Sequence, residues 1–255
     1  MPKNNITRWL VIPDLHVPSH DEKSLMAVEK LMEDYRWDGC VLLGDLMDFD
    51  VISAHNHGKP RLTEGKRLAE DYKVAAKVLD RIISKVRKRN HCARVVYISG
   101  NHEYHLQRYI DGNPALEGMG LEVPLALNLR ERRVEWIPFW EEGKIFKLGK
   151  VAFGHGLYTN DLHAKKHCLR YGCELFVYGH THAIQYYSSE MHGNGTTIAA
   201  VSLGCLCEPM PYMMGRPDRW EQAVGVLEMC GGDYGFNVIR IVGHKFIYGG
   251  RVYEG

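Results

Sequence analysis

Five short polar clusters, each directly after a run of apolar residues, constrain the fold of this chain more than any other feature. They combine Asp, Asn and His, and most contain glycine: Asp14-Leu15-His16, Gly44-Asp45-Leu46-Met47-Asp48, Gly100-Asn101-His102-Glu103, Gly154-His155-Gly156 and Gly179-His180-Thr181-His182. Short apolar runs bounded by such clusters are typical of buried strands. Because ligands bind beyond the carboxyl ends of strands in an open α/β sheet, we expect the clusters to converge on one rim.

The strands and helices between these clusters predict an α/β fold. In the first half, strands at 8–12, 40–43 and 94–98 are separated by helical patterns over 21–36 and 65–89, which predicts a parallel or mixed sheet covered by helices. The second half has a helical pattern over 161–171 and is richer in strands. These strands are expected at 134–137, 144–148, 151–153, 175–178, 196–201, 224–229 and 236–242. No linker interrupts the sequence, so we expect a single domain over residues 1–255.

The composition limits the partners and the compartment. Lys plus Arg number 32 and Asp plus Glu number 31, so the net charge of +1 disfavours a long nucleic-acid footprint. No apolar stretch is long enough to cross a membrane, and the N-terminal segment lacks the long apolar region of a signal peptide. The seven cysteines form no repeated CxxC pair, which favours reduced thiols and a cytoplasmic protein. The close pair Cys205 and Cys207 is interpreted as buried, inert thiols.

The side chains in the clusters indicate a metal centre. Imidazole, carboxylate and amide oxygen together suit divalent ions such as Mn, Fe, Zn, Co or Ni. The chain has 14 histidines, and the six or seven donors in the clusters suit two ions better than one tetrahedral ion. In an extended chain end, Asp14 and His16 lie on the same side, as do His180 and His182, so each pair can bind one ion. Asp45 can bridge two ions, as carboxylates do in two-metal hydrolysis.

At these residues the sequence resembles the calcineurin-like metallophosphoesterase superfamily, and within it the phosphodiesterase-type members of phages and bacteria. The family pattern runs Asp-x-His, Gly-Asp-x-x-Asp, Gly-Asn-His-Asp/Glu, Gly-His and Gly-His-x-His, and every position is filled between residues 14 and 182. The resemblance implies a four-layer α/β/β/α sandwich of two mixed sheets flanked by helices. It also implies phosphoester hydrolysis by a hydroxide that bridges two divalent ions. We expect manganese, with iron, zinc, nickel, cobalt or magnesium as alternatives.

The resemblance also assigns roles to individual residues. The implied ligands are, for the first ion, Asp14, His16, Asp45 and His182 and, for the second ion, Asp45, Asn101, His155 and His180. His102 matches the catalytic histidine of the family, which contacts the phosphate and protonates the leaving oxygen. Asp48 matches a position that orients a ligand or an active-site histidine.

Two features favour a phosphodiesterase that acts on nucleotide-type or oligonucleotide substrates. The last cluster carries both His180 and His182, whereas Ser/Thr protein phosphatases of the family usually lack the second histidine. Ser99 stands where those phosphatases usually carry an arginine that clamps a phosphate dianion, although Glu103 is shared with them. A phosphomonoesterase, including a protein phosphatase, is the alternative enzyme. A catalytically inactive scaffold of the same fold is the alternative of a different class, and it is disfavoured because every motif position is filled.

The segment 208–220 is expected to be an irregular loop that contacts the substrate. Tyr212 and Trp220 can stack on a base, and Arg216 or Arg219 can hold a phosphate. A packed surface loop or an oligomer contact is the alternative for this segment. The expected partner is a phosphoester, with a nucleotide or a short single-stranded nucleic acid as candidates, and the oligomeric state is left open.

Two further sets of residues are given structural interpretations. The basic residues between 81 and 94 are interpreted as the C-terminal turn of a helix that faces water. His163 and His167 lie four residues apart on a predicted helix and share a face. They are interpreted as solvent-facing or as support for the site.

Overall fold

The computed structural model describes residues 6–56, 58–191, 195–209 and 220–255. Its larger sheet has six strands in the spatial order β11 (Asp233–Ile241), β10 (Gln222–Cys230), β1 (Thr7–Ile12), β2 (Gly39–Leu42), β3 (Arg94–Ile98) and β4 (Val134–Ile137). Strands β1 to β4 are parallel, while β10 is antiparallel to both of its neighbours. The sheet is therefore mixed, as the sequence predicts.

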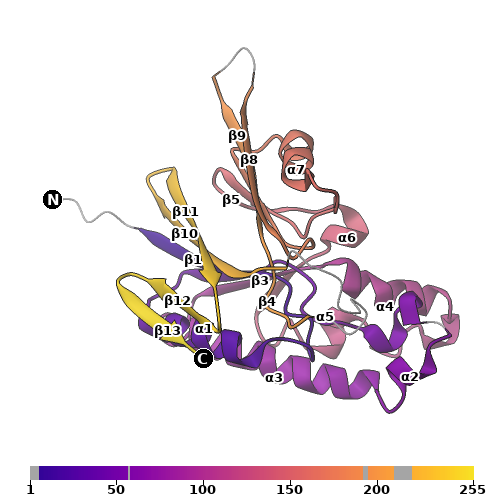
Figure 1. Ribbon diagram of the computed structural model, residues 1–255. Helices are drawn as coiled ribbons and strands as arrows, with labels where there is room; N and C mark the ends of the chain where they lie inside the picture. The colour runs from indigo at the N-terminus through magenta and orange to yellow at the C-terminus, as the bar shows by residue number, and fades with distance from the viewer. Residues whose placement is uncertain (1–5, 57, 192–194, 210–219) are drawn as a thin grey trace.

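The second sheet is also mixed and faces the first (Figure 1). Its five strands lie in the order β5 (Phe146–Leu148), β6 (Val151–Phe153), β7 (Leu175–Tyr178), β9 (Thr197–Leu203) and β8 (Ile184–Glu190). Strands β6, β7 and β9 are parallel, and the two edge strands are antiparallel to them. A separate hairpin, β12 (Lys245–Tyr248) with β13 (Arg251–Glu254), packs beside the first helix.

Helices cover the outer faces of the two sheets, and short helices also occur in the connecting loops. The helices are α1 (Glu22–Asp34), α2 (Pro60–Thr63), α3 (Leu68–Val86), α4 (Asn101–Asp111), α5 (Val123–Ala126), α6 (Phe139–Glu142) and α7 (His163–Tyr171), with 3₁₀ turns at Asp50–Ile52, Ala54–Asn56 and Pro114–Leu116. Helices α1 and α3 contact each other, and α7 packs on β8 and β9. Figure 1 shows α3 and α7 on opposite sides of the molecule. Among the described residues, no helix combines the length and apolar character needed to cross a membrane.

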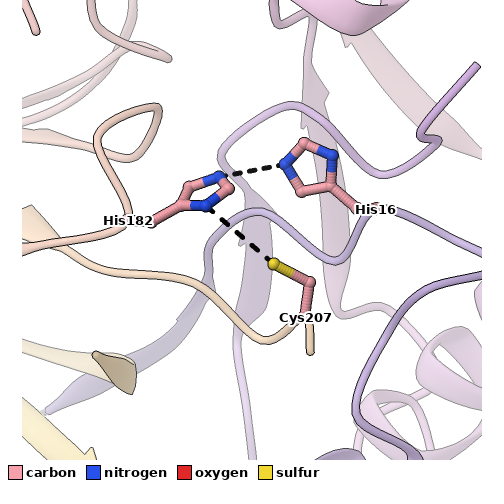
Figure 2. A group of neighbouring side chains, drawn as sticks. All are labelled: His16, His182 and Cys207. Carbon is pink, nitrogen blue, oxygen red and sulfur yellow. Dashed lines mark hydrogen bonds between the residues drawn. The ribbon is translucent and has the colours of Figure 1, made fainter. Parts of the chain in front are cut away.

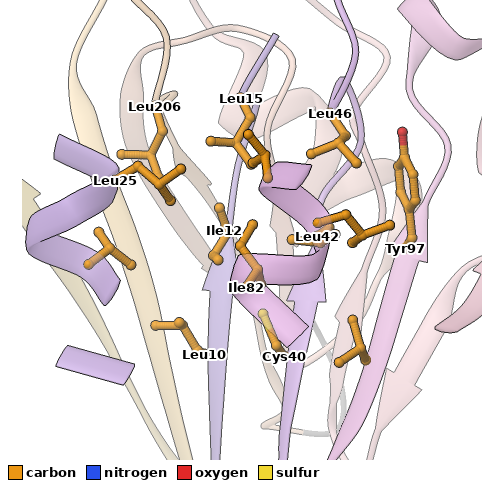
Figure 3. Close-up of a cluster of buried hydrophobic side chains, with 14 of the residues drawn as sticks. Leu10, Ile12, Leu15, Leu25, Cys40, Leu42, Leu46, Ile82, Tyr97 and Leu206 are labelled. Carbon is orange, nitrogen blue, oxygen red and sulfur yellow. The ribbon is translucent and has the colours of Figure 1, made fainter. Parts of the chain in front are cut away.

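Alternate residues of β1 pack into two different cores because successive side chains of a strand point to opposite faces. Leu10 and Ile12 lie in the core between the larger sheet and helices α1 and α3 (Figure 3). Trp9 and Val11 lie in the second core, together with buried residues of β6, β7 and β9. Helix, sheet, sheet and helix thus follow one another, which confirms the predicted four-layer sandwich.

The basic residues near the end of α3 face the neighbouring helix α1. Arg81 forms ion pairs with Glu22 and Glu29, and both Lys85 and Lys88 pair with Glu33. These cations therefore stabilise the α1–α3 contact and do not form an unpaired basic surface for nucleic acid.

Candidate functional site

The five polar clusters follow the carboxyl ends of β1, β2, β3, β6 and β7. Because β1, β2 and β3 are parallel to one another, and β6 and β7 are parallel to each other, their ends meet at one rim of the two sheets. The seven predicted metal ligands lie at this rim: Asp14, His16, Asp45, Asn101, His155, His180 and His182. The predicted convergence is therefore present in the structure.

One set of side chains gathers around His16. We call Asp14, His16, Asp45 and His182 the first donor group. The Nε2 atoms of His16 and His182 are 3.0 Å apart, and Nε2 of His182 is 3.5 Å from Asp14 Oδ1. The Nε2 atom of His16 also lies 3.7 Å from Asp45 Oδ2. Two imidazole nitrogens and two carboxylates therefore point at one small volume.

A second set gathers around His155. We call Asp45, Asn101, His155 and His180 the second donor group. Nε2 of His155 is 3.2 Å from Asp45 Oδ2 and 3.0 Å from Asn101 Oδ1. Ligand atoms of Asp45, His155 and His180 all lie within 4.8 Å of one another. Because Asp45 Oδ2 approaches both His16 and His155, this carboxylate belongs to both groups.

The electrostatics favour the metal-binding protonation state at two ligands, Asp45 and His180, whereas the carboxylate of Asp45 outweighs burial and raises the pKa of His155 to about 9, so an ion must displace a proton from His155. Burial alone would raise the pKa of Asp45, but the imidazoles of His155 and His102 hold that pKa well below its ordinary value. Burial, with the nearby His155, lowers the pKa of His180 to about 3. Asp45 is therefore a carboxylate and His180 a neutral imidazole at neutral pH, which are the forms that bind divalent ions.

The backbone at these ligands differs from the extended conformation expected from the sequence. Positive φ angles occur at Asp14 (28°), His16 (50°), Asp45 (47°), His180 (69°) and His182 (55°). Such angles are unfavourable for residues with a side chain, and strained conformations of this kind gather at functional sites. The prediction that each Asp-x-His or His-x-His pair converges from an extended chain is therefore wrong, because tight left-handed turns direct these side chains.

Two glycines are required by close approach to the ligands. A Cβ on Gly100 would lie 2.1 Å from Asp45 Oδ1, and a Cβ on Gly179 would lie 2.0 Å from Asp14 Oδ2. Asp14 also accepts the backbone N–H of His180 at 2.9 Å. The clusters thus pack directly against each other's side chains.

Glu103 joins two of the loops, a role that the sequence did not reveal. Its buried carboxylate accepts the backbone N–H groups of Asp45 (2.9 Å), Met47 (3.2 Å) and Gly100 (2.7 Å), and the hydroxyl of Tyr97 (2.6 Å). Burial and the charge of Asp45 raise the pKa of Glu103 to about 7. Glu103 therefore fixes the loop after β2 against the start of α4.

Asp48 and His102 lie beside the first donor group. Asp48 Oδ1 is 3.2 Å from Nδ1 of His16 and 3.4 Å from Nδ1 of His102. The Nδ1 atom of His102 also lies 2.5 Å from the carbonyl oxygen of Asp48. A carbonyl only accepts hydrogen bonds, so Nδ1 of His102 carries a hydrogen and Nε2 is left facing the site, 3.9 Å from Asp45 Oδ2.

His182 is held by sulfur and an aromatic ring. Its Nδ1 atom lies 4.0 Å from the thiol of Cys207, as Figure 2 shows. By contrast, Nδ1 of His16 faces a carboxylate of Asp48, and Nδ1 of His155 lies 2.8 Å from the carbonyl of Leu43. The indole of Trp220 packs edge-on against the His182 ring, with 4.1 Å between centroids.

Cys205 and Cys207 are buried and free, as the sequence predicts. Cys207 nevertheless occupies the position where a ligating histidine normally has an oxygen acceptor. The description of this thiol as inert packing is therefore incomplete.

His163 and His167 are buried, so the prediction of solvent-facing side chains is wrong. Nδ1 of His163 lies 2.6 Å from the Tyr178 hydroxyl. His167 accepts the backbone N–H of Leu157 at 2.8 Å and that of Tyr158 at 3.3 Å. His167 thereby holds the loop that follows the His155 cluster, which matches the alternative of support for the site.

The predicted substrate contacts Tyr212, Arg216 and Arg219 lie outside the described residues. The structure instead places a cavity of about 360 Å³ directly beside His102. It is lined by Asp48, Asp50, Ser53, Asn56, Lys59, Asn101, His102 and His105. The sequence did not predict this cavity. The one sequence feature that pointed toward it was the polar segment that follows the second cluster.

Comparison with known proteins agrees with this geometry. A family model described as calcineurin-like phosphoesterase matches residues 7–183. The search of curated proteins gave no match. Similar solved structures include Vps29 from Entamoeba histolytica complexed with Zn²⁺, which is 15% identical, covers 98% of this chain and 97% of its own, and has a TM-score of 0.44.

Two other structures show a similar level of likeness. Vps29 from Chaetomium thermophilum is 11% identical, with 93% of this chain and 87% of its own covered and a TM-score of 0.48. A metallophosphoesterase from Sphaerobacter thermophilus is 15% identical, with 92% and 89% covered and a TM-score of 0.43. The family match spans well over half of the chain and includes all five clusters. This protein therefore belongs to the calcineurin-like phosphoesterase family.

Proposed function

We propose that the protein is a binuclear metal-dependent phosphodiesterase that hydrolyses nucleotide-type or oligonucleotide phosphodiesters. The observation that carries this proposal is the position of Asp45, whose Oδ2 lies within 3.7 Å of His16 in the first donor group and 3.2 Å of His155 in the second. One carboxylate shared by two sets of donors is the arrangement that holds two ions side by side.

The donor sets fit divalent ions. Each group combines imidazole nitrogen with carboxylate oxygen, and the second adds the amide oxygen of Asn101, a mixture that suits Mn, Fe, Zn, Co or Ni. We propose two ions, with manganese as the expected metal. When bound, such ions supply Lewis-acid activation of water and of the phosphate oxygens.

His102 is the group proposed to protonate the leaving oxygen. Its Nδ1–H donates to the Asp48 carbonyl, which fixes the ring and leaves Nε2 facing the site. In the proposed reaction His102 enters as the imidazolium, with Nδ1–H on the Asp48 carbonyl and a second proton on Nε2. The oxygen of water forms a bond to phosphorus and releases a proton, the bond from phosphorus to the leaving oxygen breaks, and Nε2 of His102 gives that oxygen a proton. The proton released by water restores the imidazolium. Asp48 acts through His16 and His102, since its carboxylate faces Nδ1 of both rings.

The surroundings of Ser99 favour a diester over a monoester. Ser99 is buried, and its hydroxyl donates to Glu141 and accepts the backbone N–H of Trp140 at 3.1 Å. This position therefore offers no cation to the second negative charge of a phosphate monoester. Arg81 and Lys85 of α3 are also paired with carboxylates of α1. A substrate with one negative charge at phosphorus suits such a site better.

Comparing two chromogenic substrates tests the proposal. We expect kcat/KM for bis(para-nitrophenyl) phosphate to exceed that for para-nitrophenyl phosphate by about tenfold or more in Mn²⁺, and Asp45→Asn to abolish both activities. A faster monoesterase would favour the phosphomonoesterase or protein phosphatase. If the protein neither bound divalent ions nor cleaved either ester, the inactive scaffold would be correct.

The proposal also covers the cellular compartment and the partners of the enzyme. All seven cysteines are free thiols, which supports a cytoplasmic protein. The proposed partners are a nucleotide or a short single-stranded nucleic acid.

A further inference from the structure

The cavity beside His102 has two walls of different origin. One wall comes from the loop after β2 and contributes Asp50, Ser53, Asn56 and Lys59. The other comes from the start of α4, where Asn101, His102 and His105 line it. Asn101 and His102 also belong to the proposed site. The part of a substrate that enters this cavity is therefore the part bonded to phosphorus on the side that faces His102.

The loop wall is held in a defined conformation. The side-chain amide of Asn56 donates to the carbonyl of Asp50 at 2.7 Å, and the backbone N–H of Lys59 donates to the carbonyl of Asn56 at 3.0 Å. Phe49, just before this loop, is fully buried and packs edge-on against Tyr72, with 5.7 Å between ring centroids. The cavity is therefore a formed site between two anchored elements.

The chemistry of the walls selects for a polar occupant. Every described residue that lines the cavity is polar, and the walls include carboxylates, amides, a hydroxyl, imidazoles and an ammonium group. Such walls offer hydrogen-bond donors and acceptors next to the carbon surface of the same side chains. Asp50 is ion-paired with Lys66, and the lining also holds one further carboxylate, Asp48, and one ammonium group, Lys59. The balance of charge therefore suits a neutral occupant that carries hydroxyl groups.

The size of the cavity limits the occupant further. Its volume of about 360 Å³ lies at the lower end of small-molecule sites, which span roughly 300 to 1,000 Å³. This space holds one sugar-bearing unit such as a nucleoside. It excludes a duplex and a folded protein segment.

We infer that this cavity binds the leaving alcohol of the substrate and that this alcohol is a nucleoside. The inference rests on the proposed phosphodiesterase function and names the substrate class at that site. His105 and Lys59, one from each wall, hold the sugar hydroxyls or the base by hydrogen bonds. The proton from His102 goes to the nucleoside oxygen as its bond to phosphorus breaks.

Two diesters that differ in their leaving alcohol test this inference. Thymidylyl-(3′→5′)-thymidine releases thymidine, and thymidine 3′-(methyl phosphate) releases methanol, while both yield thymidine 3′-phosphate. The rate of formation of thymidine 3′-phosphate in Mn²⁺, followed by chromatography, gives kcat/KM for each. We expect the wild-type ratio to favour the dinucleotide by about tenfold or more, since one or two net hydrogen bonds are worth about that factor.

Variants locate the source of this preference. His105→Ala and Lys59→Ala should each reduce the ratio by about threefold to tenfold, since each removes one polar partner. Gln107→Ala is the matched control on α4, because Gln107 is exposed and donates to Asp111 at 2.9 Å, outside this cavity. That control should keep the wild-type ratio.

The outcomes separate this inference from the proposed function. A wild-type ratio near one, with bis(para-nitrophenyl) phosphate still cleaved, would overturn the nucleoside site and leave the phosphodiesterase intact. If His105→Ala and Lys59→Ala both keep the wild-type ratio, the preference for the dinucleotide arises elsewhere in the protein. That result would also overturn the nucleoside site. If no diester is cleaved, the proposed function fails and this inference fails with it.

Discussion

Acidification should destabilise the fold through one buried imidazole, that of His167. Its Nδ1–H donates to the carbonyl oxygen of His163 at 2.8 Å, while its Nε2 accepts the N–H groups of Leu157 and Tyr158. A proton on Nε2 would face two other hydrogens, so the folded protein holds this ring neutral. Burial lowers the pKa of His167 to about 4, and neighbouring positive groups add to this effect.

The sign and size of the effect follow from the two pKa values. The unfolded chain takes up the proton near the ordinary histidine pKa of about 6.5, whereas the folded chain stays neutral down to a pH of about 4. Between these limits the unfolded state binds more protons, so the free energy of unfolding decreases as the pH falls, by up to about 1.4 kcal/mol per pH unit. At about pH 5 the loss from this group amounts to roughly 2 kcal/mol.

Urea unfolding of wild type and His167→Gln, with excess chelator present, measures this contribution. Glutamine places an acceptor oxygen near the position of Nε2 and does not titrate. Between about pH 7.5 and about pH 5, the wild type should lose roughly 2 kcal/mol more than the variant, because the other histidines titrate in both proteins and cancel. Equal losses in the two proteins would refute the assignment of a neutral, accepting His167.

Three further variants probe the site itself. His102→Ala should lower kcat by about 10² to 10⁴ while metal analysis finds the ion content of the wild type; loss of an ion would instead make His102 a ligand. Cys207→Ala should weaken metal binding by roughly tenfold or more in calorimetric titration, because His182 loses the partner of its Nδ1 atom. Cys168→Ala, equally buried but in α7, is its control and should bind metal normally. Gly179→Ala should displace Asp14, whose Oδ2 lies 2.0 Å from the added Cβ, so metal binding should fall more than in Cys207→Ala; an intact metal site would show that this close approach is not required.

The fold and the rim were predictable because both depend on local patterns. Strands β3, β4, β6 and β7 have the predicted bounds. Strands β3, β6 and β7 are short apolar runs closed by polar residues or glycine, while β4 is bounded by Arg133 and Pro138. Strand β8 was missed because Ile184–Glu190 carries several polar residues and its exposed and half-buried side chains alternate at a sheet edge. The hairpin of β12 and β13 was missed for a similar reason, since most of its side chains are exposed.

The side chains that support the ligands, such as Cys207 and Glu103, could not be predicted from the sequence because the residues they contact are distant along the chain. The thiol of Cys207 meets His182 across 25 positions, and Glu103 meets Asp45 across 58. A cysteine or glutamate in the sequence carries no sign of such a contact, and packing alone determines it. The cavity beside His102 was hidden for the same reason, since its two walls come from separate elements.

The contacts around the ligands explain how three of the five keep an unfavourable backbone. At two of these ligands, Asp45 and His180, a buried carboxylate accepts the backbone N–H of the ligand itself, and the N–H of His16 donates to the backbone carbonyl of Asp45 at 2.8 Å. Glu103 accepts the backbone N–H groups of Asp45 and Met47, and Asp14 accepts that of His180. An unpaired buried N–H costs roughly 1 to 3 kcal/mol, which is comparable to the strain of one such turn. The loops therefore cannot relax without losing these bonds, so the fold itself holds the ligands in a binding conformation.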